Sequence, residues 1–183
     1  MNALLLIDIQ LGFNAPGWGT RNNPDAEARA GELLAAWRAA DRPIVHICHV
    51  SKELGSPLSG PGTAFKPEVM PRAGEKIVEK SVNSAFIGTN LHNHLQRVGA
   101  TDLTICGLTT PHCVSTTTRM AGNLNYNVRL VADACAAFTS NADVSFDGGP
   151  LLSAEEIHRT ALAHLHGEFA EVCIAEEALS RAG

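Results

Sequence analysis

The chain has 183 residues, of which 45% are hydrophobic and 18% are charged, and its formal net charge is −5. The length suits one domain over residues 1–183, and the acidic balance gives no electrostatic reason to expect nucleic acid or a membrane surface as a partner. No apolar run reaches the roughly 18 residues of a membrane span, and the start, MNALLLIDIQLGF, lacks the basic segment that opens a signal peptide.

The first half of the chain begins with a strand signal. Residues 3–7 contain the run LLLI, which is typical of a strand buried on both faces. We expect a helix over 25–40, where apolar residues are spaced to share one face, and a second strand over 44–50. Residues 51–74 follow, rich in Gly, Pro and Ser and without periodicity. A loop this long is usually functional or disordered, so it is a candidate for shaping a pocket or reaching a neighbouring subunit.

The second half continues the alternation of strands and helices. The expected elements are a strand at 76–79, a helix at 90–98, a strand at 103–106, a helix from about 113, a strand at 128–132, a helix at 154–165 and a strand at 171–174, before a short polar tail. This pattern predicts an α/β fold with three layers, α-β-α: an open, mostly parallel six-stranded sheet with helices on both faces, Rossmann-like in outline. Sites on such sheets lie at the carboxyl ends of the strands, near the point where the strand order reverses.

Three chemically active residues fall at expected strand ends. Asp8 directly follows the first strand, so it is either a buried carboxylate that caps a turn or a general base tuned by burial. Lys80 follows the third strand, so it is either a solvated surface lysine or a fixed cation near a thiol or carboxylate. Cys113 follows the turn after the fourth strand, at a helix start. Backbone N–H groups at such a start can lower a thiol pKa well below ~8.5 and bind a developing oxyanion.

The five cysteines indicate reduced thiols rather than a disulfide framework, since their number is odd and no CxxC motif occurs. We therefore expect a cytoplasmic protein. Cys48, Cys106 and Cys173 lie in apolar runs and are typical of small buried hydrophobic residues. Cys113 differs from the other cysteines because it alone lies at a helix start, and that position favours a nucleophile.

Four segments together resemble a known family. They are LLLIDIQ at 4–10, EKSVNSAFIGTNL at 79–91, GLTTPHCVSTTTRMAGNLNYNV at 107–128 and VADAC at 131–135. With these segments the sequence resembles the isochorismatase-like cysteine hydrolases, which include N-carbamoylsarcosine amidohydrolase and nicotinamidase relatives. The match covers nearly the whole chain, and the segment at 107–128 is the most specific part of it.

The resemblance implies a catalytic triad of Asp8, Lys80 and Cys113. In such enzymes the Asp takes the thiol proton and later returns it to the leaving amine, while the Lys keeps the site cationic and orients the Asp. Cys113 would form a thioester with a small amide, carbamoyl or ureido compound, whose C–N bond is cleaved. The resemblance also implies a cis peptide bond between Leu108 and Thr109, which would aim the Thr109 N–H at the oxyanion beside the Cys113 N–H.

Two departures from the family narrow this expectation. True isochorismatases lack the nucleophilic cysteine, since vinyl-ether hydrolysis needs no acyl intermediate, so Cys113 favours amide or carbamoyl chemistry. Nicotinamidases carry a DxH metal motif after the second strand, whereas HICHVSKELG at 46–55 has no Asp ahead of His49. Alternation along the strand also sends His46 and Cys48 to the opposite face from His49. We therefore expect no metal and no other cofactor, with His49 left open as a substrate contact.

Four further residues are candidates for contact with a small-molecule substrate. Phe13, Trp18 and Phe86 follow strand ends, and they either line an apolar pocket or belong to the core or an interface. His112 is expected in the pocket rather than as the base, because neighbouring side chains at a helix start diverge.

Two other functions stay open at this point. A thiol-based redox protein would pair Cys113 with a resolving partner such as Cys106 or Cys135, and a non-catalytic binding relative would keep the pocket without turnover. The resemblance also suggests a homodimer or homotetramer, which the composition neither supports nor opposes.

Overall fold

A computed structural model describes residues 1–180, and its strands form one sheet. They are β1 (Asn2–Ile7), β2 (Ile44–His49), β3 (Lys76–Lys80), β4 (Asp102–Leu108), β5 (Asn127–Ala136) and β6 (Glu171–Cys173). Every neighbouring pair is parallel, in the order β3-β2-β1-β4-β5-β6. The predicted open, six-stranded sheet is confirmed, and it is parallel throughout.

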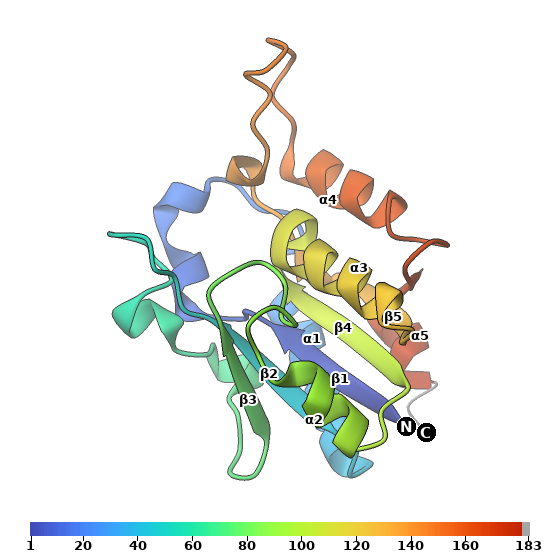
Figure 1. Cartoon of the computed structure of the whole chain (residues 1–183). Coiled ribbons are helices and arrows are strands. Elements are labelled where there is room, and N and C mark those ends of the chain that lie inside the picture. The colour runs from blue at the N-terminus through green and yellow to red at the C-terminus, as the bar shows by residue number, and fades with distance from the viewer. Residues whose placement is uncertain (181–183) are drawn as a thin grey trace.

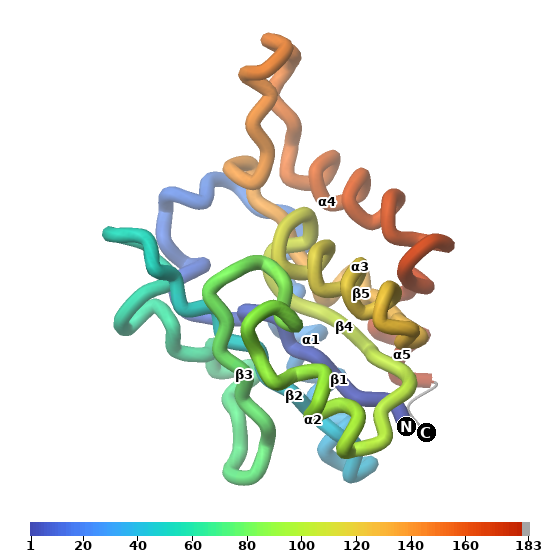
Figure 2. The backbone as a smooth tube through the Cα atoms, viewed as in Figure 1, coloured from blue at the N-terminus to red at the C-terminus, as the bar shows by residue number. Residues whose placement is uncertain are grey.

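Helices cover both faces of this sheet (Figure 1). They are α1 (Ala26–Ala39), α2 (Leu91–Arg97), α3 (Ser115–Asn123), α4 (Ala154–Ala163) and α5 (Ala175–Ser180). α1 packs against α5, β1 and β5, and lies behind the sheet, whereas α2 and α3 lie in front of it. The backbone trace in Figure 2 shows the same three layers. Within residues 1–180, none of these helices is long and apolar enough to cross a membrane.

β1 forms the centre of the core because its apolar run is covered on both faces. Leu4, Leu5 and Ile7 are fully buried, and Trp37 of α1 belongs to the same cluster. Burial of each such side chain contributes about 1.5–3 kcal/mol. The central strand is therefore a firm support for the residue that follows it, Asp8.

Two elements differ from the sequence-based expectation. β5 runs past its predicted end at 132, and its pairing with β4 shifts register between Ile105 and Gly107. The expected polar tail is in part the helix α5, in which Ala175 and Ala178 are buried. Alanine favours helix but gives little hydrophobic signal, so this short segment reads as polar. Residues 181–183 of the tail lie outside the described part of the chain.

The long loop at 51–74 folds back over the carboxyl end of β1. It contains two short 3₁₀ turns, Gly60–Thr63 and Pro67–Val69. Between them, Phe65 pairs with Gln10 through an isolated antiparallel bridge. The loop is thereby fixed beside the edge of the sheet where sites are expected.

Candidate active site

The carboxyl ends of four neighbouring strands bring polar side chains together. Asp8 follows β1, His49 ends β2, Lys80 ends β3 and Thr109 follows β4. The strand order reverses between β1 and β4, which is the place where sites form on open parallel sheets. The three residues predicted from strand ends therefore lie at one edge, with Cys113 in the turn that follows β4.

The backbone around this edge has special conformations. Asp8 has a φ of 50°, which is uncommon for a residue other than glycine. In β4, Gly107 has a φ of 130°, and a Cβ at this position would collide with the Ile7 carbonyl oxygen. Only glycine allows β4 to approach β1 this closely. The peptide bond between Leu108 and Thr109 is cis, at the position that the resemblance implies.

Lys80 bridges the other polar groups of the site. Its Nζ lies 2.6 Å from Asp8 Oδ2, 3.0 Å from His49 Nδ1 and 3.3 Å from Cys113 Sγ. The side chains of Asp8 and Lys80 are 0% exposed. An ammonium group has three N–H donors, and these three partners use all of them. The structure thus brings Asp8, Lys80 and Cys113 together and adds His49 to the group.

The thiol of Cys113 differs from the expectation in its ionisation. It lies buried in a π-helical turn, Thr110–Val114. Burial raises its pKa to about 12, the charge of Asp8 adds to this rise, and Lys80 opposes it. The predicted low thiol pKa at a helix start is therefore wrong, because desolvation outweighs the effect of the nearby Lys80 cation.

Asp8 is placed to accept the proton of that thiol. Burial raises the pKa of the Asp8 carboxyl, partly offset by Lys80, so the group binds a proton more readily than an ordinary aspartate. Its Oδ1 is fully enclosed and has no hydrogen-bond partner within residues 1–180. An enclosed, unpartnered carboxylate oxygen beside a protonated thiol is suited to general base chemistry.

The same atoms resemble a metal site at first sight. One ligand atom each from Asp8, His49 and Cys113 lie within 4.8 Å of one another. Lys80 Nζ, however, contacts all three residues and already supplies the positive charge there. A divalent ion would be repelled by this ammonium and compete with it for the same lone pairs. The donor set therefore does not fit a metal, and His46 lies elsewhere, with its Nε2 2.9 Å from Glu75 Oε2.

A cavity of about 280 Å³ opens above the thiol. Its wall includes Phe13, Trp18, Thr109 and His112 as well as Cys113. The Phe13 and Trp18 rings pack with their centroids 4.9 Å apart, which gives the cavity an apolar side. Further lining residues come from the loop at 51–74 and from the segment after β3; they are Ser51, Lys52, Glu53, Ser56, Leu58, Ser81, Val82 and Asn83. The loop at 51–74 therefore shapes the pocket, as one of its two expected roles requires.

Phe86 does not belong to this cavity. Its ring stacks on Tyr126 at a centroid distance of 6.1 Å and packs against the main core. Of the readings left open for Phe86, the pocket is therefore wrong and the core holds: Ser81, Val82 and Asn83 line the cavity, whereas the ring of Phe86 is taken up by the core. Asn83 lines the cavity instead, with its Oδ1 3.7 Å from Cys113 Sγ. Sequence reasoning missed Asn83 because a lone asparagine in a loop carries no distinguishing pattern.

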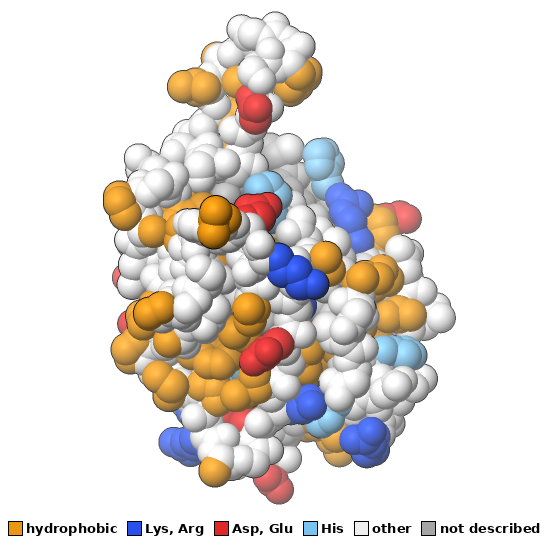
Figure 3. All heavy atoms as spheres, turned by 60° about the vertical axis from the view of Figure 1, so that its left-hand side comes forward, with side chains coloured by type: hydrophobic (Ala, Val, Ile, Leu, Met, Phe, Trp, Pro, Cys, Tyr) orange, Lys and Arg blue, Asp and Glu red, His pale blue; other side chains and the backbone are white. Residues whose placement is uncertain are grey.

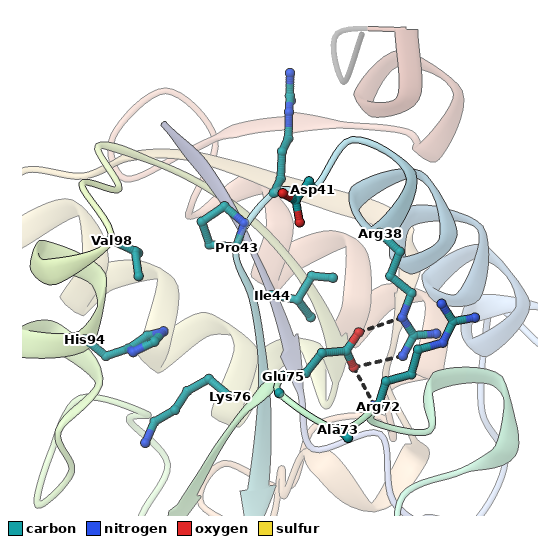
Figure 4. A pocket seen from close by; sticks show the side chains of 12 residues that line it. Arg38, Asp41, Pro43, Ile44, Arg72, Ala73, Glu75, Lys76, His94 and Val98 are labelled. Atoms are coloured by element: carbon teal, nitrogen blue, oxygen red, sulfur yellow. Dashed lines mark hydrogen bonds and ion pairs between the residues drawn. The ribbon is translucent and has the colours of Figure 1, made fainter.

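Another cavity, of about 550 Å³, lies away from Cys113 (Figure 4). Its wall includes Pro43 and Lys76, which lie at the amino ends of β2 and β3, at the opposite edge of the sheet. Glu75 points into it and is bonded by the Arg38 guanidinium and the Arg72 backbone N–H. The charge of Glu75 is thus satisfied internally, and the residues between 1 and 180 that line this cavity include no cysteine.

The resolving cysteines of the redox reading are poorly placed. Cys106 and Cys135 are both 0% exposed within β4 and β5, and all five cysteines are free thiols. Burial raises the pKa of each of these two, that of Cys135 to about 12. Neither is set up to react with an oxidised Cys113.

The sequence of this chain matches a known protein family. Residues 2–177 match the isochorismatase domain. The chain is 41% identical over 182 residues to the uncharacterized isochorismatase family protein YrdC of Bacillus subtilis (strain 168), covering 97% of this chain and 94% of that protein. It is 26% identical over 171 residues to nicotinamidase 3 of Arabidopsis thaliana, covering 92% of this chain and 72% of that protein.

Solved structures share the fold. A protein of the isochorismatase family from Chromobacterium violaceum ATCC 12472 superposes with a TM-score of 0.93 at 44% identity, covering 100% of this chain and 93% of that one. A cysteine hydrolase from Pseudomonas syringae pv. phaseolicola 1448A superposes with a TM-score of 0.87 at 26% identity, covering 99% and 92%. The α/β architecture is therefore common to these proteins.

Proposed function

The chain belongs to the isochorismatase family, whose members are hydrolases, and from that premise we propose that it cleaves a C–N bond in a small amide, carbamoyl or ureido compound through a thioester on Cys113. One observation carries the proposal: the buried Lys80 ammonium donates to both Asp8 and Cys113. A base, a nucleophile and a fixed cation in mutual contact are the parts that acyl transfer needs.

The first half-reaction forms the thioester. Cys113 Sγ attacks the carbonyl carbon as its proton passes to Asp8, and the carbonyl oxygen becomes an oxyanion. The backbone N–H groups of Thr109 and Cys113, two residues on the cavity wall, would stabilise that oxyanion. When the tetrahedral intermediate collapses, the C–N bond breaks and Asp8 returns the proton to the leaving nitrogen, which departs as ammonia or an amine.

The second half-reaction releases the acid. Water attacks the thioester carbon, Asp8 takes its proton, and the C–S bond breaks. Asp8 then reprotonates the sulfur, which restores the thiol of Cys113. The product is the carboxylic or carbamic acid, so one water is consumed for each C–N bond cleaved.

The charge balance of the site suits this proton transfer. Before attack, the carboxylate of Asp8 and the ammonium of Lys80 neutralise each other beside a neutral thiol. After transfer, a protonated Asp8 leaves Lys80 paired with the thiolate at the 3.3 Å contact. The buried site is neutral in both states, so the transfer does not require an uncompensated charge to be buried.

Amide-type chemistry is favoured over vinyl-ether hydrolysis by the nucleophile itself. A thiol beside a general base serves a reaction with an acyl intermediate, and hydrolysis of a vinyl ether needs none. Two of the similar proteins, the cysteine hydrolase and the nicotinamidase, support the same direction by their names.

The test is an ammonia-release screen over small amides and ureido acids. Cys113→Ala should lower turnover of any active compound by at least about 1,000-fold, because no acyl intermediate can form. Cys173→Ala, which changes a cysteine in β6 at the far edge of the sheet, is the matched control and should keep full activity. Full activity of Cys113→Ala would overturn the proposal.

Mass spectrometry separates this function from the redox reading. Rapid quenching with an active substrate should show an acyl group on the peptide that contains Cys113. High-yield conversion of Cys113 to a disulfide under mild peroxide, with no acyl adduct, would favour a redox protein instead.

A further inference from the structure

We propose that His49 is a substrate-binding residue of this site, whose Nε2–H donates a hydrogen bond to an oxygen of the amide bound at Cys113. The inference rests on the proposed function and adds a substrate contact to it. It also narrows the substrate class. The compound must carry an oxygen acceptor that reaches His49, at the end of β2, while its scissile carbonyl lies at the Cys113 thiol.

The position of the proton on the imidazole follows from Lys80. His49 Nδ1 lies 3.0 Å from Lys80 Nζ, and an ammonium group can only donate. Nδ1 must therefore accept this hydrogen bond and carry no proton. In a neutral imidazole the proton is then on Nε2, which becomes a donor with a defined direction.

That donor faces the cavity. His49 is half-buried and lies on the wall of the cavity that contains Cys113. Within residues 1–180, no protein atom accepts a hydrogen bond from Nε2, and Nε2 is not among the fully enclosed atoms without a partner. The nitrogen is therefore accessible from the cavity, where a substrate oxygen can reach it.

The backbone of His49 is held in place by Gln10, a fully buried residue just after β1. Gln10 Oε1 accepts from the His49 N–H at 2.8 Å, and Gln10 Nε2 donates to the His49 carbonyl at 3.0 Å. The same Nε2 also donates to the Thr63 carbonyl at 3.0 Å, which ties the loop at 51–74 to this point. With its backbone bonded to Gln10 and its Nδ1 to Lys80, the imidazole is preorganised, as a binding group should be.

His49 also stays neutral around the substrate. Burial lowers its pKa to about 4, and the charge of Lys80 acts in the same direction. A neutral donor adds direction to the site without adding a second cation beside Lys80. It therefore suits a carbonyl or ureido oxygen, which accepts a hydrogen bond and carries no charge that needs neutralising.

Two variants separate the two nitrogens of the imidazole. In His49→Asn the side-chain oxygen can take the place of Nδ1 as the acceptor for Lys80, but the donor toward the cavity is lost. In His49→Gln the amide NH₂ can take the place of Nε2 as the donor. We expect His49→Asn to lower kcat/KM by at least 10-fold on the best substrate of the ammonia screen. We expect His49→Gln to stay within about 3-fold of the unchanged enzyme.

A second measurement shows whether the thiol site itself is intact. Methyl methanethiosulfonate reacts with thiols and has no carbonyl group, so its rate with Cys113 should be the same in His49→Asn and in the unchanged chain. A normal kcat/KM in His49→Asn, or an equal loss in both variants, would overturn the inference. Cys113→Ala, measured in the same assay, tests the proposed function separately. If this variant is inactive, the proposed function is supported even when the results of the His49 variants contradict the role of His49.

Discussion

The proton on Cys113 determines how the nucleophile is used. Because burial raises the thiol pKa to about 12, the resting sulfur is protonated at neutral pH. Lys80 is close enough to stabilise a thiolate, but the neighbouring Asp8 carboxylate opposes one. The thiolate therefore forms only as Asp8 takes the proton, and the base is essential rather than auxiliary.

The pH dependence of Cys113 reactivity tests this coupling. In the unchanged protein we expect the rate at which methyl methanethiosulfonate converts the Cys113 thiol to a methyl disulfide, with release of methanesulfinate, to rise as Asp8 ionises, with an apparent pKa above 3.8, and to stay level from there to about pH 9. In Asp8→Asn the base is gone, and the smaller rise in the thiol pKa that comes from the Asp8 charge is lost, but burial, the first cause of the raised pKa, remains. The rate should then be lower at pH 7 and should climb between pH 7 and 10.

Peptide mass spectrometry of the methyl disulfide product assigns the rate to Cys113 rather than to the other cysteines. A level profile in Asp8→Asn would mean that the thiolate exists without Asp8, and the role of the base would have to be abandoned.

The polar residues at strand ends could be predicted, but their contacts could not. Asp8 and Lys80 stand out because each follows an apolar run, and Cys113 stands out because it starts a helix. The contact between His49 and Lys80 depends on the register of β2 against β3, which places these two residues opposite each other. Register is set by the whole sheet and is not visible in either strand alone.

At the scale of elements, Glu75 connects α1, β2 and β3 at the amino edge of the sheet. Its carboxylate accepts from Arg38 Nε at 2.7 Å, lies 2.9 Å from His46 Nε2 and accepts from the Arg72 N–H at 2.7 Å. The bonds to Arg38 are the main reason that the pKa of Glu75 is lowered from 4.5 to about 2. The side chain is 13% exposed, so solvent screens these contacts only in part.

Glu75→Gln should destabilise the protein by about 1–2 kcal/mol at pH 7, because charge-assisted hydrogen bonds become neutral ones. A carboxyl whose pKa is lowered in the folded state contributes stability above its unfolded pKa and loses it as the pH falls. The gap in unfolding free energy between the two proteins should therefore be full above about pH 4.5 and shrink as the pH falls toward 2. Urea unfolding at pH 7, 4 and 3 measures it, and a gap that is constant with pH would contradict the linkage.

Strands and long helices could be predicted because their periodicity is local. The run of β1 and the spacing within α1 appear in the sequence itself. The extension of β5 beyond 132 could not be predicted, since Asp133 interrupts the apolar run and the strand continues by pairing with β4. α5 could not be predicted for a similar reason. Its buried alanines carry little hydrophobic signal in the sequence, and they are buried because α5 packs against α1.

At the scale of the whole molecule, one segment stands apart from the packed layers. Residues 143–152, here called the arm, project away from the sheet before α4 begins (Figure 1). Phe146 is 83% exposed and Leu151 is 89% exposed, and Figure 3 shows apolar side chains on this projecting part. Local turns shape the arm, with Asp143 Oδ1 accepting from the Ser145 N–H and Asp147 Oδ1 from the Gly149 N–H.

We propose that the arm supports the homodimer or homotetramer expected from the family resemblance, by packing against a second copy of this chain. Burial of a phenylalanine or a leucine side chain contributes about 1.5–3 kcal/mol each. Phe146 and Leu151 would gain this free energy when a second copy covers them, which explains why two apolar side chains project from the molecule. The double variant Phe146→Ser with Leu151→Ser should therefore sediment as a smaller species than the unchanged protein at the same concentration. Leu54→Ser, which removes a still more exposed leucine from the loop at 51–74, is the control. If the control variant dissociates and the arm variant does not, the loop forms the interface and the arm does not.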